Sequence, residues 1–323
     1  AIIVGLTAAF FSNYALALTA GASTNAFWFG FEAWRWMFWI EIAPAIVFFI
    51  TLLTIPESPR FLVLSGKKDQ AQRVLARLFG EAAAAAKVAE IDASLAADHH
   101  RPKLADLIDP ATKRLRRIVW VGIGLATFQQ LVGINVVFYY GAVLWQSVGF
   151  SESDALLINI INGVASIVAC TITILFIDRI GRRPFLLWGS VGMAATLGLM
   201  VIAFSMASLD ADGQLQLPGG VGRLALVAMV SYAFVFNMTW GPVMWVMLGE
   251  MFPNQIRGSG LAVSGLAQWT SNFGIAMTFP IMLASIGLAG AYGLYFVFAA
   301  ISVLFVLRMV HETRGVELED MEG

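Results

Sequence analysis

The chain has 323 residues, of which 59% are hydrophobic and only 13% charged, and its mean hydropathy is +0.78. Soluble domains are roughly half apolar, so this composition excludes a water-soluble globular protein and predicts an integral membrane protein. The formal net charge of −1 gives no reason to expect nucleic acid as a partner.

Apolar segments long enough to cross a bilayer recur along the chain. A hydrocarbon core about 30 Å thick requires about 20 apolar residues per helix. Such segments lie near residues 1–20, 36–54, 118–147, 155–177, 185–208, 222–248, 260–285 and 288–310. The sequence therefore predicts an all-α polytopic membrane protein, embedded in a lipid bilayer, with eight spans in this chain.

The distribution of lysine and arginine predicts the orientation, because short loops rich in these residues stay in the cytoplasm. Twelve of the 20 basic residues lie within 55–117, and alternation of the spans places six more in cytoplasmic loops. Only Arg35 and Arg223 are left on the other side. We expect a multi-pass protein of a bacterial inner membrane, with the 55–117 insert and the C-terminus cytoplasmic.

Residues 55–117 form the one sizeable polar insert. Ala71, Val74, Leu75, Leu78 and Phe79 repeat at helical spacing and predict an amphipathic helix. The alanine-rich segment 81–97 predicts a second helix, with a shorter one near 103–108. A solvated linker without structure is the alternative interpretation.

The segments that follow the second and eighth spans resemble each other. Residues 56–60 read PESPR and residues 312–315 read ETRG, and six spans separate them. Six-helix repeats are typical of secondary transporters, which hold substrate between the two halves. We therefore expect residues 1–54 to be the last two helices of an N-terminal half and 55–117 a cytoplasmic helical linker domain. Residues 118–310 would be the C-terminal six-helix half and 311–323 a cytoplasmic tail. On this reading four N-terminal helices are missing, and the fragment alone transports nothing.

The third span carries the densest group of polar residues, in the sequence QQLVGINVVFYY at 129–140. At about 100° per residue, Gln129, Asn135, Tyr139 and Tyr140 fall on one stripe about 120° wide, and Gln130 points elsewhere. Gly133 allows a local break that would bring Gln130 to the same cavity. Amides and phenols both donate and accept hydrogen bonds, so they suit a hydroxylated substrate. Interhelical stabilisation by the amides is the alternative.

Two later spans repeat this pattern. In the sixth, Pro242 removes a backbone hydrogen bond close to Asn237, Trp240, Gly241 and Trp245, and so predicts a broken helix. The indole of Trp245 could cover the apolar face of a sugar ring, or could be an interfacial anchor as expected for Trp28, Trp36 and Trp39. In the seventh, the polar and aromatic residues are Gln268, Trp269 and Asn272, with Gln268 and Asn272 on one face.

Acidic and basic residues occur together in three expected cytoplasmic loops. An arginine fork pairs well with a carboxylate, so such pairs could latch the helix ends and release when the halves rock. The candidate gate residues are Glu57, Arg60, Asp178, Arg182, Arg183, Glu250, Arg257 and Glu312. Ordinary positively charged loops are the alternative interpretation for each of them.

These motifs together resemble the sugar porters of the major facilitator superfamily over essentially the whole chain. PESPRFL, QQLVGINVVFYY, DRIGRRP, GPVMW followed by EMFPNQIRG, and ETRGVELED occur in the order and spacing typical of that family. The resemblance, to bacterial sugar:proton symporters and facilitative glucose transporters alike, implies a fold of twelve helices in two halves, of which this chain holds helices 5 to 12.

The resemblance also implies roles for individual residues. The implied sugar-cavity positions are Gln129, Gln130, Asn135, Tyr139, Gly241, Trp245, Gln268 and Trp269, and the implied gate includes Asp178, Arg182, Glu250 and Arg257. Three positions depart from the family pattern: Leu6 stands where a cavity glutamine is usual, Ser166 where asparagine is frequent, and His311 where proline is usual. The first two leave the choice of hexose or pentose open.

Several functions are compatible with these observations. A monosaccharide:proton symporter working by alternating access, a uniporter and a non-transporting sugar sensor all fit, because the coupling carboxylate of the family lies in a helix outside this sequence. An enzyme does not fit, since His99, His100 and His311 are all in cytoplasmic segments and no span carries a nucleophile and base pair or metal-ligand spacing. We expect no cofactor and no metal. Cys170, the only cysteine, is expected to be a packing residue.

Overall fold

The structure is a computed structural model that describes residues 2–97, 103–110, 112–147, 149–209, 215–253 and 255–315. His99 and His100 lie outside the described residues. The chain forms two compact units, one made of Ala1–Met37 with Lys103–Gly323 and the other of Phe38–Pro102. The all-α fold class is confirmed, with one short pair of two-residue strands in the described part.

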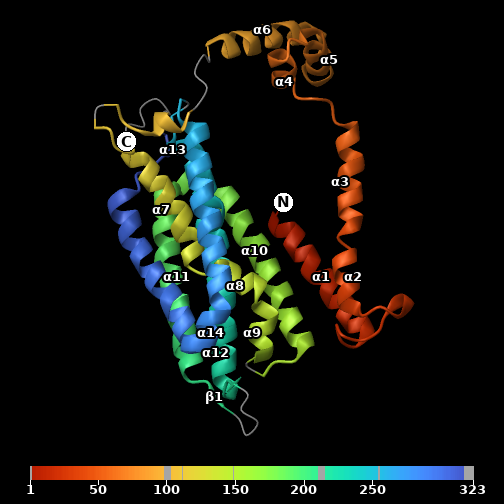
Figure 1. Cartoon of the computed structure of the whole chain (residues 1–323), viewed down its shortest axis with the longest axis vertical. Helices are drawn as coiled ribbons and strands as arrows, with labels where there is room; N and C mark the ends of the chain where they lie inside the picture. The colour runs from red at the N-terminus through yellow and green to blue at the C-terminus, as the bar shows by residue number, and fades with distance from the viewer. Residues whose placement is uncertain are drawn as a thin grey trace. The chain divides into compact units, whose positions relative to one another are not determined.

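The first unit contains the transmembrane bundle (Figure 1). Its elements are α1 (Ile2–Ala20), η1 (Trp28–Gly30), η2 (Leu104–Leu107), α7 (Arg117–Leu131), α8 (Ile134–Tyr139), α9 (Gly141–Ser147), α10 (Glu152–Ile180), α11 (Arg182–Ser205), β1 (Ser208–Leu209), β2 (Leu215–Gln216), α12 (Gly219–Met238), α13 (Trp240–Met251) and α14 (Arg257–Met309). Helix α2 (Ala33–Trp39) crosses the boundary between the two units.

Seven helical segments in the described residues are long and apolar enough to cross a membrane. The last is α14, whose 53 residues would form a straight rod about 80 Å long, more than twice the hydrocarbon thickness. A non-helical residue, Gly287 (φ 70°, ψ 180°), interrupts it, and Figure 1 shows its two arms in lighter and darker blue. Helix α14 therefore contains both segments, 260–285 and 288–310, that the sequence predicts as separate spans.

The helix breaks expected at Gly133 and Pro242 are both present. Helix α7 ends at Leu131, Gly133 has φ +82°, and α8 begins at Ile134. The sixth span divides at Thr239 (φ −125°, ψ −90°) into α12 and α13. Because Pro242 has no N–H, upstream carbonyls need other donors. Side chains of α10 supply them, Thr173 to Met238 O and the Cys170 thiol to Asn237 O at 3.3 Å.

Helix α1 packs against α10 through a close contact at Gly163. An added Cβ there would lie 2.6 Å from Oγ1 of Thr7, a side chain that is itself 4% exposed. Small residues at such crossings allow backbones to approach within membranes, where packing drives helix association. The Thr7–Gly163 contact is therefore what sets the distance between these two helices.

We expect Gly163→Ala to lower the melting temperature of the purified complete protein. The β-branched Thr7 has little rotamer freedom, so the helices must separate, at about 1 to 3 kcal/mol for overpacking. Gly274→Ala is the matched control, because an added Cβ there meets nothing within 4 Å. That change removes a helix-destabilising glycine and should leave stability unchanged or raised. Equal melting temperatures for the two variants would contradict this account of the α1–α10 contact.

The second unit contains α3 (Ile42–Thr54), α4 (Pro59–Leu64), α5 (Lys68–Phe79) and α6 (Glu81–Ala97). The amphipathic helix and the alanine-rich helix expected in the insert are thus confirmed as α5 and α6. They enclose a small core of Leu62, Val63 and Ala71. Leu107, which the sequence assigns to the same linker, is 2% exposed and belongs to the main hydrophobic core of the first unit.

Candidate substrate site and cytoplasmic charge cluster

Five amide side chains form one continuous hydrogen-bonded chain beside the α7–α8 break. Gln268 and Gln130 both donate to Gln129 Oε1, at 3.0 and 2.9 Å. Asn135 donates to Gln130 Oε1 at 2.7 Å and to Asn272 Oδ1 at 2.8 Å. We call these five residues the amide chain. On a regular helix Gln130 would point away from Asn135, and the break at Gly133 turns α8 so that Asn135 meets Gln130.

The amide chain also reaches the second broken span. Gln129 Nε2 lies 3.5 Å from Trp240 O and 3.4 Å from Gly241 O, at the start of α13. Gly241 therefore contributes through its backbone carbonyl. The Oε1 atom of Gln268 is buried and has no hydrogen-bond partner among the described residues. A buried amide oxygen without a donor is an open acceptor that a hydroxyl could fill.

Two tyrosines hold the α7–α8 break in place. Tyr232 donates from its hydroxyl to Val132 O at 2.7 Å, which satisfies a carbonyl at the end of α7. The Tyr295 ring lies against Gly133, where an added Cβ would be 2.4 Å from Cδ2. Positive φ and this contact both require glycine at 133. These contacts fix how Gln129 and Asn135 are oriented relative to each other.

Among the aromatic residues predicted for the site, Tyr139 and Trp269 lie on α8 and α14, which also carry amide-chain residues, and Trp245 lies on α13. Tyr139, Trp245 and Trp269 are 59%, 46% and 63% exposed in the described chain. Trp240, in contrast, is fully buried and donates to Leu186 O and Ser190 Oγ, both at 3.0 Å. Trp240 is therefore a packing anchor between α11 and α13, whereas the other aromatics present open faces.

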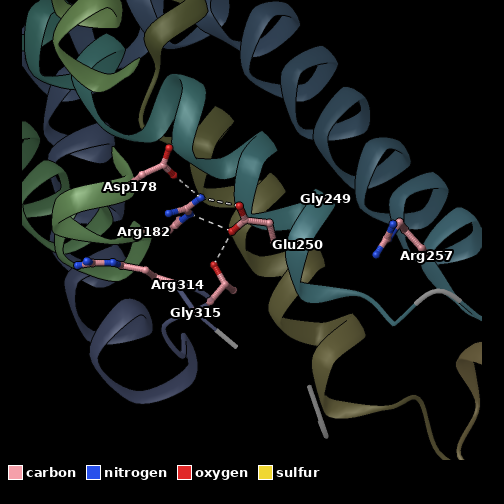
Figure 2. A pocket seen from close by; sticks show the side chains of 8 residues that line it. Asp178, Arg182, Gly249, Glu250, Arg257, Arg314 and Gly315 are labelled. Atoms are coloured by element: carbon pink, nitrogen blue, oxygen red, sulfur yellow. Dashed lines mark hydrogen bonds and ion pairs between the residues drawn. The ribbon is translucent and has the colours of Figure 1, made fainter. Parts of the chain in front are cut away.

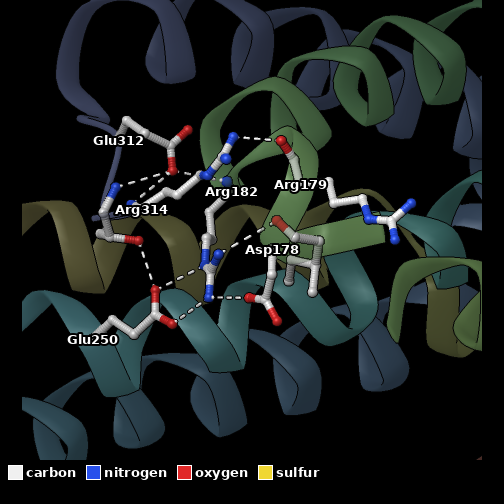
Figure 3. Close-up of polar contacts among 8 residues, drawn as sticks. Asp178, Arg179, Arg182, Glu250, Glu312 and Arg314 are labelled. Carbon is white, nitrogen blue, oxygen red and sulfur yellow. Dashed lines mark hydrogen bonds and ion pairs between the residues drawn. The ribbon is translucent and has the colours of Figure 1, made fainter. Parts of the chain in front are cut away.

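Arg182, at the first residue of α11, is the centre of a charged cluster. Its Nε and Nη2 donate to the two carboxylate oxygens of Glu250 at 2.9 and 2.6 Å, a bidentate pair. Nη2 also lies 2.9 Å from Asp178 Oδ1, and Thr313 Oγ1 donates to Glu250 Oε2 at 2.7 Å. Figure 3 shows these side chains meeting from α10, α11, α13 and the segment after α14. The cluster ties together the ends of four chain segments.

Glu312 caps the N-terminus of α11. Its two carboxylate oxygens accept from the backbone N–H groups of Arg182 and Arg183, at 2.8 and 3.0 Å. An anion is stabilised there by the free N–H groups and the helix dipole. The preceding Gly181 has φ +100°, and an added Cβ would lie 2.6 Å from Glu312 Oε2. Arg183 also donates to Leu307 O at 3.0 Å, which joins the α11 start to α14.

A cavity of about 430 Å³ opens beside this cluster (Figure 2). It is lined by Asp178, Arg182, Gly249, Glu250, Arg257, Thr313, Arg314 and Gly315. Arg257 donates from Nε to Phe252 O at 3.3 Å, and its buried Nη2 has no hydrogen-bond partner among the described residues. The remaining predicted gate residues, Glu57 and Arg60, belong to the other compact unit.

Two residues of these networks, Asn272 and Thr313, are not among the site residues predicted from the sequence. The sequence analysis places Asn272 on one face with Gln268 but does not include it among the site residues, although this i, i+4 spacing indicates that it belongs there. Thr313 had no such signal, because its contact with Glu250 depends on how the end of α14 meets α13.

The broken spans, the buried amides and the apolar helices define a polytopic helical membrane protein with the fold of the major facilitator superfamily. The family model described as "Sugar (and other) transporter" matches residues 1–323. The chain therefore belongs to this sugar transporter family, which is a family of transporters and not of enzymes.

Individual relatives agree with this assignment. A glucose transport protein of Synechocystis sp. is 45% identical over 99% of this chain and 68% of its own length. The D-xylose-proton symporter of Escherichia coli (strain K12) is 37% identical over 100% of this chain and 62% of its own length. A structure of the proton:xylose symporter XylE bound to 6-bromo-6-deoxy-D-glucose has 35% identity and a TM-score of 0.73, covering 99% of this chain and 64% of that one. This chain thus spans about two thirds of its relatives' length.

Proposed function

We propose that this chain is part of a secondary active transporter that carries a monosaccharide, a hexose or pentose, together with protons by alternating access. The amide chain is the proposed sugar site, and the observation that supports it most is the buried, unpartnered Oε1 of Gln268. A hydroxyl donor from a sugar would satisfy this oxygen without any change in the other hydrogen bonds of the chain.

The lack of charge in the middle of the spans supports a neutral substrate. In the sequence of α7 to α14, lysine, arginine, aspartate and glutamate occur only near the helix ends. An ionic substrate would call for a charged partner at mid-depth, because an unpaired charge in the bilayer is costly. Amides pair with hydroxyls as both donors and acceptors. The open faces of Tyr139, Trp245 and Trp269 would cover the apolar faces of the ring.

The Arg182 cluster is the proposed cytoplasmic gate. As described, its bonds lie within the transmembrane unit and hold α10, α11 and α13 together. Glu57 and Arg60, the other predicted gate residues, belong to the second unit and remain candidate gate residues. The positive-inside pattern supports a cytoplasmic position for this face and for the insert.

Uptake of labelled monosaccharides by the complete protein, with and without a protonophore, tests the coupling. We expect uptake against a gradient that collapses when the protonophore is added, because the sugar would then lose the proton gradient that drives its accumulation. Uptake that does not change when the proton gradient is removed would contradict symport and favour uniport. Sugar binding without uptake in the same vesicles would instead favour a sensor.

A further inference from the structure

The segment between α1 and α2 is an ordered aromatic hairpin. Ala26 and Glu32 form an antiparallel bridge, and Phe27 N donates to Phe31 O at 2.7 Å. Trp28, Phe29 and Gly30 form its tip as η1. The base is tied to the bundle, because Ser23 N donates to Glu152 Oε1, at the start of α10, at 3.1 Å. Its position is therefore set relative to the end of a transmembrane helix.

The tip presents aromatic side chains outward. Phe29 is 88% exposed and Trp28 is 62% exposed. Phe29 has φ +57°, a left-handed conformation that is strained for a bulky residue. The Trp28 ring stacks on Phe27 at 5.1 Å, and Trp36 supports both Trp28 and Phe29, at 5.6 and 6.2 Å. A favourable contact made by the exposed aromatic rings would offset this backbone strain.

The hairpin carries no unbalanced charge. Glu32 and Arg35 are the only charged residues of 21–36, and they pair with each other at 3.3 Å. Arg35 also lies over the Trp34 ring at 4.7 Å, and the Trp34 indole donates to Glu32 at 3.0 Å. Apolar rings with an internally neutralised polar side suit the boundary between lipid headgroups and acyl chains.

We propose that the hairpin tip of Trp28 and Phe29 inserts into the lipid headgroup–acyl boundary at the membrane face where α1 ends and α10 begins. One candidate span ends at Ala20, before the hairpin, and the next begins at Ala33, after it. Helix α10 begins beside the base of the hairpin. These three helix ends place the hairpin at one face of the membrane. Figure 1 shows the connection between α1 and α2 projecting away from α10. The tip thus anchors the connection between two spans.

Spin labels on the complete protein in lipid vesicles test this proposal. Trp28→Cys and Phe29→Cys are labelled separately in a Cys170→Ser background, which keeps a donor for Asn237 O. We expect the ratio of collisions with oxygen to collisions with a water-soluble nickel chelate to be several-fold higher than at Glu90→Cys, a control on α6 whose wild-type side chain is 76% exposed.

Three results would overturn the proposal. A ratio equal to that of Glu90→Cys would place the tip in water. Shielding from both oxygen and nickel at both positions would indicate contact with protein. A loss of label mobility on adding monosaccharide would make the tip a carbohydrate contact. None of these readouts depends on transport, so the proposal can fail while the sugar-transport proposal stands, and the reverse.

Discussion

Gln129→Ala in the complete protein is expected to reduce monosaccharide uptake about tenfold or more while leaving expression intact. The substitution removes the oxygen that accepts from both Gln130 and Gln268, so the amide chain loses its central member. Each buried donor left without a partner costs about 1 to 3 kcal/mol, and about 1.4 kcal/mol corresponds to a factor of ten in affinity. The site would lose both its shape and its bonds to the sugar.

Asn159→Ala is the matched control, because Asn159 is a buried amide on α10 outside the amide chain. Sugar binding to the purified variants distinguishes the two roles that an amide can have here. If Gln129 contacts sugar, Gln129→Ala loses sugar-induced thermal stabilisation, although the ligand-free protein still melts cooperatively. Transport at the wild-type level in Gln129→Ala would make the amides interhelical contacts only.

Arg182→Ala is expected to produce the second large effect, a loss of uptake accompanied by a loss of stability. The Arg182 side chain is 10% exposed, and its guanidinium forms the bidentate pair with Glu250, whose side chain is 33% exposed. Removal of one member of a buried pair leaves the other charge uncompensated, at about 3 kcal/mol. Arg182→Lys should recover little, since an ammonium cannot reproduce the two parallel bonds.

Arg179→Ala controls for the loss of one positive charge in the same loop. Arg179 is exposed, and its backbone carbonyl, which accepts from Arg314, is unaffected by the substitution. The pairwise contribution follows from a double-mutant cycle of Arg182→Ala with Glu250→Gln, measured as melting temperature and as uptake. Strict additivity of the two changes would show that the pair is not coupled and would remove it from the proposed gate.

Local features of the sequence predicted the helix breaks and the shared helix faces around the candidate site. Gly133 and Pro242 each act on their own stretch of backbone, so the breaks in the third and sixth spans could be located without any knowledge of packing. Gln268 and Asn272 share a face through helical periodicity alone. The predicted bounds of the alanine-rich helix, 81–97, coincide with α6 because alanine stabilises a helix through its own propensity.

Local sequence patterns do not predict which side chains from distant segments meet. The sequence predicts that a break at Gly133 brings Gln130 toward the polar stripe. It does not predict that Tyr232 and Tyr295 hold the left-handed turn at Gly133. The sequence predicted Arg182, Glu250 and Glu312 as gate residues in separate cytoplasmic segments. It did not predict that Arg182 pairs with Glu250, or that Glu312 caps the start of α11.

The sequence by itself determined that this chain crosses a membrane, where its helices break and which polar residues lie within them, because hydropathy, glycine and proline act locally. Only the tertiary structure decided which polar groups meet. The amide chain, the capping of α11 by Glu312 and the outward aromatic hairpin all depend on contacts across helices and loops, and those contacts are selected by packing over the whole bundle rather than by residue spacing.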